Sequence, residues 1–298
     1  MSARWTAERI PDQSGRVAIV TGANAGLGLE TARVLGLKGA RVILASRNEM
    51  RATAALERLR ATGGATRFEF QHLDLSALSS VRTFAERFRS KSDRLDLLIN
   101  NAGVMIPPFS RTADGFELQF GVNYLGHFAL TGLLFDRLAA TPGSRVVSLS
   151  SMAHRGGAID FESFTGDTPY RPIRAYQQSK LACLMFALEL QKRMEGSPSG
   201  ISSLGAHPGA TKTELQRHNR LVDFGSSLIS MDVTKGTLSQ LYAATEPTAQ
   251  GGEYIGPTGW LEARGYPGTA KIDPAALDST VRERLWSASE ALTGIRYP

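Results

Sequence analysis

The sequence has 298 residues, of which 42% are hydrophobic and 21% are charged. These fractions are close to those of average soluble globular proteins, so they exclude a disordered chain, a collagen-like fibre and a coiled coil. The 34 basic and 28 acidic residues leave a net charge of +6, but the basic residues are dispersed and form no basic stripe. Because no nucleic-acid reading motif is present either, we expect no nucleic-acid partner.

Several features that the sequence lacks indicate the cellular compartment of the protein. A single cysteine, Cys183, excludes an intramolecular disulfide, and no Asn-x-Ser/Thr acceptor site for glycosylation is present. The first residues are polar and contain no apolar core of a signal peptide. No apolar run approaches the roughly 20 residues that a spanning helix needs. We therefore expect a cytoplasmic protein with no membrane partner.

Strands and helices are expected to alternate along most of the chain. Short β-branched runs that end in glycine or polar residues predict strands, and longer segments with helical spacing of apolar residues predict helices. The expected strands are 16–21, 41–45, 67–73, 95–100, 145–150, 201–206 and 252–255. The expected helices are 30–38, 50–60, 76–88, 114–138, 175–194, 233–245 and 274–291.

This order predicts the α/β class, with a doubly wound Rossmann fold. The strands are almost continuously apolar, so they should form a mostly parallel seven-stranded sheet with helices on both faces, in three α/β/α layers. No linker or repeat divides the chain, and we expect one domain over 1–298. Two polar stretches interrupt the alternation and are expected as binding-site loops, an insertion at 155–174 and a substrate lid at 211–231.

A glycine-rich turn follows the first expected strand and reads TGANAGLG at 21–28. Gly22 can make the tight turn, Gly26 lets the backbone approach a pyrophosphate, and Gly28 lets the helix pack closely on the strand. The pyrophosphate would face the N-terminus of the following helix. A purely structural turn is the alternative, but the position at the first strand–helix junction favours a dinucleotide site.

The end of the second expected strand bears on the choice of cofactor. An NAD-binding chain offers a carboxylate there to the ribose hydroxyls, whereas this chain has Ser46 and Arg47. A guanidinium pairs well with phosphate oxygens, and an acid would repel them. The sequence therefore predicts NADP(H); the alternative is that Arg47 is merely a solvent-exposed side chain.

Four polar residues are candidates for the chemistry. Tyr176 and Lys180 are four positions apart, so they lie on the same face of one expected helix. Ser150 and Ser151 close the fifth expected strand, and Asn123 lies in the long preceding helix. Taken singly, each could be structural: a packing tyrosine, a solvated lysine, a turn-forming serine and a helix amide.

The combination resembles a known family. The spacing Gly-x-x-x-Gly-x-Gly, the sequence NNAG at 100–103 and the Tyr-x-x-x-Lys pair together resemble the short-chain dehydrogenase/reductase family in its one-domain form. The extended sugar-nucleotide epimerases fit less well, because they have glycine at the position of Ala25. The resemblance implies that Tyr176 is the general acid, Lys180 holds the nicotinamide ribose, Ser151 bonds the substrate carbonyl and Asn123 supports a water relay.

The same resemblance implies further contacts with the cofactor. Asp74 would meet the adenine, although it could equally cap a helix beside Ser76. The Pro-Gly motif after the sixth expected strand would meet the nicotinamide amide and the phosphates. The remaining implied contacts are Asn24, Leu27, Leu75, Asn101, Ala102, Gly103, Pro208, Gly209 and Thr211.

The implied reaction transfers hydride between NADP(H) and a carbonyl or alcohol carbon. A free tyrosine loses its proton only near pH 10, so a neighbouring cation such as Lys180 is needed to favour phenolate. In the reducing direction Tyr176 would protonate the developing alkoxide, and the Ser151 hydroxyl would stabilise it.

The sequences SSMAH at 150–154 and IDF at 159–161 resemble the subgroup of retinol dehydrogenases and protochlorophyllide reductases. The segment between Ser151 and Tyr176 is longer than usual for the family, which places an insertion beside the active site. Apolar residues in the insertion and the lid predict a hydrophobic ketone, aldehyde or alcohol as substrate. The expected pocket residues are Ser151, Ala153, His154, Phe161 and Leu215.

Three other hypotheses concern metals, function class and assembly. No clustered Cys/His spacing exists, so we expect no metal, and His154 and His207 should be loop or core histidines. A non-catalytic NADP(H)-binding sensor is the alternative function, although it would not require Ser151 and Tyr176 together. The helices that start near Asp114 and Ala175 resemble those that pair in family oligomers, which makes a homo-oligomer possible.

Overall fold

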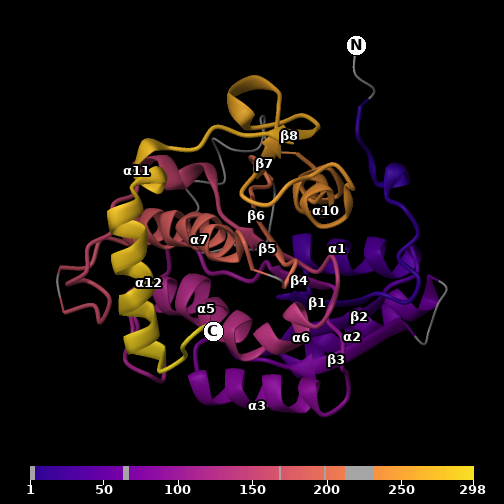
Figure 1. Ribbon diagram of the computed structural model, residues 1–298, viewed down its shortest axis with the longest axis horizontal. Coiled ribbons are helices and arrows are strands. Elements are labelled where there is room, and N and C mark those ends of the chain that lie inside the picture. Colours follow the sequence, from indigo (N-terminus) through magenta and orange to yellow (C-terminus); the bar gives the residue numbers. More distant parts are fainter. Residues whose placement is uncertain (1–3, 63–66, 168, 198, 212–230) are drawn as a thin grey trace.

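The computed structural model describes residues 4–62, 67–167, 169–197, 199–211 and 231–298. An eight-stranded sheet lies at its centre, with strand order β3-β2-β1-β4-β5-β6-β7-β8 (Figure 1). The strands are β1 Val17–Thr21, β2 Arg41–Ser46, β3 Phe68–His72, β4 Leu97–Asn100, β5 Arg145–Leu149, β6 Ser202–Ala206, β7 Tyr254–Pro257 and β8 Pro267–Thr269. The first seven pair in parallel, and β8 pairs antiparallel to β7.

The helices alternate with the strands, as a doubly wound fold requires. The longer ones are α1 Gly26–Leu37, α2 Glu49–Ala61, α3 Leu78–Arg89, α5 Gly126–Leu133, α7 Pro172–Met194, α10 Leu238–Thr245 and α12 Ser279–Thr293. The shorter ones are α4 Leu118–Phe120, α6 Phe135–Ala139, α9 Val233–Gly236 and α11 Pro274–Leu277. The α/β class and the mostly parallel sheet are confirmed, and the sheet has one strand more than the expected seven.

Two apolar cores fill the space between the sheet and its helices, one on each face. Alternate residues of a strand contribute to the cores on opposite faces of the sheet, since successive side chains of a strand point to opposite sides. Ile19 and Ile43 belong to the core under α3, α5, α7 and α12. Val20 and Leu44 belong to the core under α1, α2 and α10. The layers are therefore helix, sheet, helix, as expected.

The expected helix at 114–138 is interrupted. Glu117 accepts hydrogen bonds from the backbone N–H of Gln119 and of Phe120, so the helix begins only at α4. A π-helical turn, Gly121–Leu125, then leads into α5, and α5 and α6 are separated at Leu134. Single π-turns within helices are frequent at functional sites. This one contains the candidate residue Asn123.

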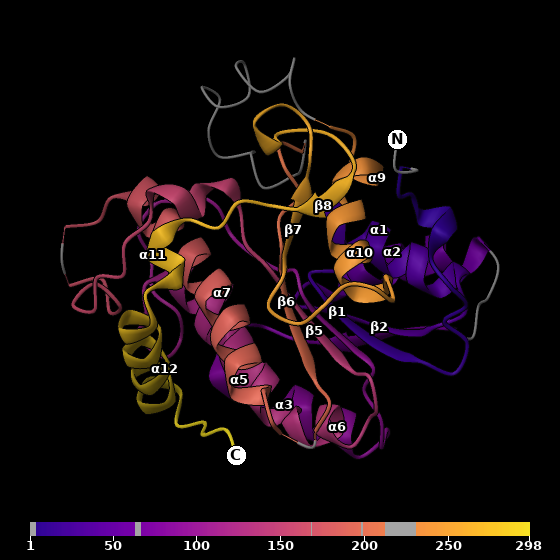
Figure 2. The same cartoon turned by 45° about the horizontal axis from the view of Figure 1, so that its top comes forward.

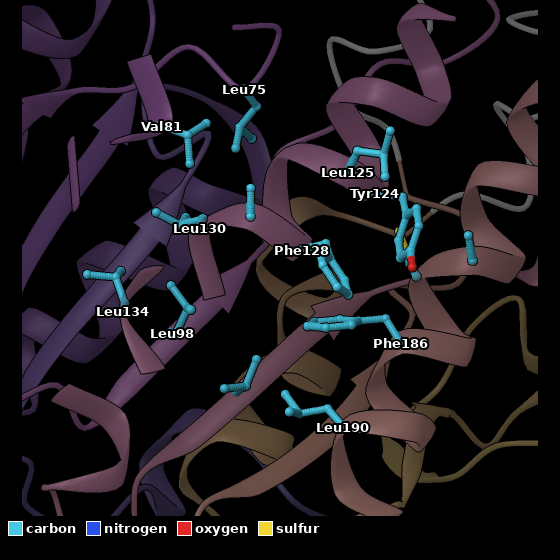
Figure 3. Close-up of a cluster of buried hydrophobic side chains, with 14 of the residues drawn as sticks. Leu75, Val81, Leu98, Tyr124, Leu125, Phe128, Leu130, Leu134, Phe186 and Leu190 are labelled. Atoms are coloured by element: carbon cyan, nitrogen blue, oxygen red, sulfur yellow. The ribbon is translucent and has the colours of Figure 1, made fainter. Parts of the chain in front are cut away.

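The C-terminal helix α12 packs against α7 (Figures 1 and 2). Its Trp286 stacks on Phe186 of α7 with ring centroids 5.9 Å apart, and meets the edge of Phe128 of α5 at 5.1 Å. Phe128 and Phe186 lie in the core beside Tyr124 (Figure 3). The helices that resemble family pairing elements thus contact α12 of the same chain, and a homo-oligomer stays a prediction.

Among the helices in the described part of the chain, none combines the length and the apolar character needed to cross a bilayer.

Candidate active site

The glycine turn lies at the carboxyl end of β1, where ligands bind in open parallel sheets. Gly22 and Gly26 have φ of +67° and +52°, a region that side chains other than glycine rarely adopt. A side chain at Gly28 would bring its Cβ within 2.6 Å of both Gly22 O and Asn101 Nδ2. All three glycines are therefore required by the backbone.

Thr21 joins this turn to the loop after β4. Its Oγ1 accepts hydrogen bonds from the backbone N–H of Asn101 and of Ala102, both at 2.9 Å. The side-chain amide of Asn101 donates in return to Thr21 O at 2.7 Å. The two segments expected to contact the cofactor are thus held together before any ligand binds.

The N-terminus of α1 is open to an anion. Its N-cap residue, Ala25, has no side chain that can accept from the first N–H groups of the helix. A Cβ at Gly26 would meet no described atom within 4 Å, so space remains in front of this turn. Asn24 is partly exposed there, whereas the Leu27 side chain is buried. This is the arrangement that binds phosphate groups at helix N-termini.

A second polar position lies at the end of β2. The Ser46 hydroxyl is buried and has no hydrogen-bond partner among the residues that the structure describes. Arg47 is exposed, and no ion pair joins its guanidinium to another described residue. Asn48 caps α2 by accepting from Arg51 N at 2.9 Å. A hydroxyl and a guanidinium are therefore available side by side at this sheet edge.

Asp74 has a structural role in the turn after β3. Its Oδ1 accepts from the backbone N–H of Ser76 at 2.9 Å and from the Ser76 hydroxyl at 2.6 Å. It does not cap α3, because Asp114 accepts from Leu78 N, the first residue of that helix, at 2.9 Å. The side chain of Leu75 is buried. Contact of Asp74 or Leu75 with adenine stays a prediction.

Lys180 and Tyr176 lie on α7 at the mouth of the site. Lys180 is only 6% exposed, and its Nζ donates to Leu149 O at 3.1 Å. Nζ lies 5.9 Å from the centre of the Tyr176 ring and 3.5 Å from the position that a Cβ at Gly103 would occupy. No other hydrogen bond from this ammonium reaches a described residue, so two of its three N–H groups are left for a ligand.

Asn123 fastens the loop after β4 to α7. Its Oδ1 accepts from Val104 N at 2.7 Å, and its Nδ2 donates to Val104 O at 3.0 Å and to Ser179 Oγ at 2.9 Å. Its backbone carbonyl accepts from Cys183 Sγ at 3.1 Å and from a ring nitrogen of His127 at 2.9 Å. The expected role of Asn123 in a water relay stays a prediction.

The two serines after β5 differ in environment. Ser150 is buried, and its hydroxyl donates to Lys180 O at 2.7 Å. Ser151 is partly exposed, and its Oγ accepts from Ala153 N at 3.2 Å at the start of the short 3-10 helix Met152–Gly156. The hydroxyl hydrogen of Ser151 is therefore still available, whereas that of Ser150 is used within the protein.

Comparison with known proteins gives the family. The sequence model of the short chain dehydrogenase family matches residues 16–222. Retinol dehydrogenase 13 of Homo sapiens is 41% identical over 95% of this chain and 86% of its own length. The chain belongs to the short-chain dehydrogenase family. Polyprenol dehydrogenase of Mus musculus is also 41% identical, over 96% of this chain and 86% of its own.

A solved structure agrees over the whole chain. The crystal structure of an uncharacterised protein from Mycobacterium paratuberculosis has a TM-score of 0.83 and 39% identity, and covers 99% of this chain and 100% of that one. The curated relatives place this short-chain dehydrogenase in the retinol dehydrogenase-like subgroup. The protein is therefore an oxidoreductase of that subgroup.

The expected pocket residues of this short-chain dehydrogenase lie in different surroundings. Ser151 and Ala153 are partly exposed, but His154 is fully buried. Its Nδ1–H donates to Ser151 O at 2.6 Å, and its Nε2 accepts from Asp273 N at 3.3 Å. Burial lowers the pKa of His154. Both ring nitrogens are thus used within the protein, and His154 supports Ser151 from behind. Its expected place in the substrate pocket stays a prediction.

Phe161 is partly exposed, and its expected place in the substrate pocket stays a prediction. Its ring packs on Phe164 at 5.5 Å, and the guanidinium of Arg284 from α12 lies 3.8 Å from its centre. These contacts make Phe161 part of the packing of the insertion against α12. Leu215 lies outside the described residues, as does most of the expected lid at 211–231.

The Pro-Gly motif forms a turn at the end of β6. Gly209 has φ of +68°, and a Cβ there would lie 2.6 Å from Ala263 O. Thr211 Oγ1 donates to Pro208 O at 2.8 Å, which fixes the turn internally. The motif is thus positioned at the sheet edge next to the loop between β7 and β8.

Two features of this short-chain dehydrogenase were missed in the sequence. Glu262, in left-handed backbone conformation at φ +57°, forms an ion pair with Arg155 and lies 3.3 Å from His207 Nε2. Burial lowers the pKa of His207 to about 4. These residues are far apart in sequence, and no local pattern could connect them. The second feature is His127, which its spacing of four from Asn123 could have revealed.

Proposed function

We propose that this protein is an NADP(H)-dependent oxidoreductase that interconverts a carbonyl and an alcohol on an apolar small molecule. The observation that carries the proposal is the buried ammonium of Lys180, which lies beside the Tyr176 ring and Gly103 with two N–H groups unfilled. A buried cation without further partners is costly, and a ligand that accepts from it would offset this cost.

The residues present fit a nicotinamide dinucleotide. The open N-terminus of α1 would hold the pyrophosphate, and Lys180 would hold the ribose next to the nicotinamide. The orphaned hydroxyl of Ser46 and the neighbouring Arg47 would hold a 2′-phosphate. When bound, the cofactor supplies the hydride chemistry, and the protein supplies binding and orientation.

In the proposed reaction, the protein's own residues transfer the proton. In reduction, the Tyr176 hydroxyl donates its proton to the substrate oxygen as negative charge develops there. The Ser151 hydroxyl donates a hydrogen bond to the same oxygen and stabilises that charge. The ammonium of Lys180 favours the phenolate that remains on Tyr176. In oxidation, the phenolate accepts the proton of the alcohol.

The names of the relatives suggest a substrate class. Two of them are called retinol dehydrogenase and polyprenol dehydrogenase, and both retinol and polyprenols are long apolar alcohols. We propose an alcohol or aldehyde of this kind as substrate. The experiment that tests this is NADPH consumption with aldehydes of increasing apolar length, with retinal among them.

Replacing Arg47 with aspartate tests the cofactor preference. The Arg47→Asp variant should raise the dissociation constant for NADPH by about 10- to 100-fold, because charge-assisted hydrogen bonds to phosphate are lost and a repulsive carboxylate is introduced. NADH affinity should change little, as measured by fluorescence titration. Arg58→Asp on α2 is the matched control for a charge change at an exposed position. Equal weakening of NADPH and NADH would contradict the 2′-phosphate assignment.

The two serines give a matched pair of variants. Ser151→Ala should lower kcat by about 100-fold or more with little change in NADPH affinity, because one donor to the developing oxyanion is removed. Ser150→Ala should instead cost about 1 kcal/mol of stability, since a buried hydrogen bond is lost, with a much smaller effect on kcat. Steady-state kinetics and thermal unfolding measure both. The reverse order of the effects on kcat would move the role to Ser150.

A further inference from the structure

His127 lies on α5, one helical turn after Asn123, and is 3% exposed. Both of its ring nitrogens have partners at the cofactor site. Nδ1 lies 2.9 Å from the backbone carbonyl oxygen of Asn123, and Nε2 lies 2.9 Å from Thr21 Oγ1. The ring thus connects the π-turn of Asn123 to the end of β1.

The direction of each hydrogen bond follows from the chemistry of the partners. A carbonyl oxygen can only accept, so Nδ1 of His127 carries the hydrogen. Thr21 Oγ1 already accepts from Asn101 N and Ala102 N, so its own hydrogen is left to donate. Two acceptors lie within its reach, Nε2 of His127 at 2.9 Å and Ile99 O at 3.3 Å, and the shorter contact is the one to His127. Burial lowers the pKa of His127 to about 4, which keeps the ring neutral near pH 7.

A protonated ring would not fit this arrangement. It would present an N–H group to Thr21 Oγ1, whose two lone pairs are already occupied by the N–H groups of Asn101 and Ala102. In the neutral Nδ1–H form, both ring nitrogens of His127 and both N–H groups that reach Thr21 Oγ1 have hydrogen-bond partners of the right kind. One continuous series of hydrogen bonds therefore runs from the loop after β4, through Thr21 and His127, to Asn123.

We propose that His127 is a positioning residue whose neutral ring orients the Thr21 hydroxyl and the Asn123 carbonyl, and thereby fixes the loop 101–103 for cofactor binding. The proposal rests on the proposed function, because it takes this loop as part of the NADP(H) site. Asn123 holds the far end of the same loop through Val104. His127 therefore acts on both ends of the segment, although it touches neither cofactor nor substrate.

Three substitutions of His127 distinguish the contributions of its two hydrogen bonds, the one at Nδ1 and the one at Nε2. His127→Phe keeps an aromatic ring and removes both hydrogen bonds. His127→Asn can keep a donor near the position of Nδ1, and His127→Gln can keep an acceptor near the position of Nε2. We expect His127→Phe to raise the dissociation constant for NADPH about tenfold, and the other two to lie between it and the wild type.

The control is a buried hydroxyl in the same core but away from this network. Ser289 on α12 is fully buried and lies 2.7 Å from the hydroxyl of Tyr124. Ser289→Ala should lower the thermal midpoint of unfolding while NADPH affinity stays within about twofold of the wild type, since it removes two local bonds, the one with Tyr124 and the one donated to Leu285 O. A loss of stability and a loss of affinity are thereby measured separately.

The deciding experiment is a double-mutant cycle on NADPH binding with Thr21→Val and His127→Phe, measured by fluorescence titration of the full chain. If the two residues act partly through their shared bond, the double variant loses less NADPH affinity than the sum of the two single losses. Additive losses would overturn the proposal, as would a His127→Phe variant that is less stable but binds NADPH normally. If His127→Phe does not fold, the same cycle with His127→Asn decides, because Asn also lacks the bond to Thr21.

This readout separates the inference from the proposed function. Coupled losses of NADPH affinity support the positioning role even if no carbonyl compound is turned over. Additive losses in a chain that does turn over NADPH overturn the positioning role alone. Failure of the wild-type protein to bind NADPH overturns both.

Discussion

Replacing Tyr176 with phenylalanine is expected to lower kcat by about 10³-fold or more, because general acid–base catalysis by a positioned side chain contributes up to about 10⁴-fold. The ring of Tyr176 beside the Lys180 ammonium stays in place, and only the hydroxyl that exchanges a proton with the substrate is removed. NADPH affinity should therefore stay within about twofold of the wild type. Steady-state kinetics and fluorescence titration measure the two quantities on the same protein.

Tyr170 provides a matched control for the loss of a tyrosine hydroxyl. Its OH donates to Pro107 O at 2.9 Å and accepts from Gln119 Nε2 at 3.0 Å, so its bonds lie in the packing of the insertion. Tyr170→Phe should keep kcat within a few-fold of the wild type. A Tyr176→Phe variant that keeps more than about a tenth of the wild-type kcat would show that another group supplies the proton.

Lys180→Met is expected to impair both binding and rate. The variant removes the N–H groups that would hold the ribose, so the dissociation constant for NADPH should rise about 10- to 100-fold. It also removes the cation that favours phenolate on Tyr176. The rate of alcohol oxidation should therefore fall as well, by about 10-fold or more. Fluorescence titration and steady-state kinetics measure these effects.

Lys192 lies on the same helix and gives the control for Lys180→Met. Its Nζ forms an exposed ion pair with Glu283 at 2.7 Å. Lys192→Met should leave NADPH affinity and kcat within about twofold of the wild type, because its partner is Glu283 of α12 and not a residue of the proposed site. A wild-type rate in Lys180→Met would contradict the proposed influence of its charge on Tyr176.

The fold could be predicted from the sequence because its signals are local. Apolar strands and helical spacing alternate along the chain, and this alternation implies a parallel sheet between two helical layers. The eighth strand, Pro267–Thr269, has only three residues and thus no recognisable periodicity. The expected helix at 114–138 begins later than expected because Glu117 caps α4, and it is interrupted further along by the π-turn and at Leu134.

Only the parts of the candidate site that belong to short sequence motifs could be predicted from the sequence. The glycine turn, Tyr176 and Lys180 have fixed spacings, and the topology brings them to one edge of the sheet. The role of His127 depends on a contact with Thr21, 106 positions away, and that of Glu262 on a contact with Arg155, 107 positions away. The burial of His154 likewise depends on the later segment around Asp273. No local sequence pattern predicts these three long-range contacts. Only the spacing of four between Asn123 and His127 is a local signal.

The most direct test of the account follows the transferred hydrogen. The protein is incubated with NADPH that carries deuterium in place of both hydrogens at C4 of the nicotinamide, together with retinal and other apolar aldehydes and ketones, and the products are analysed by mass spectrometry. We predict an alcohol with one deuterium for each NADPH oxidised, formed about 10³-fold more slowly with Tyr176→Phe. Binding of NADPH without deuterium in any product would contradict the oxidoreductase account and favour an NADP(H)-binding sensor.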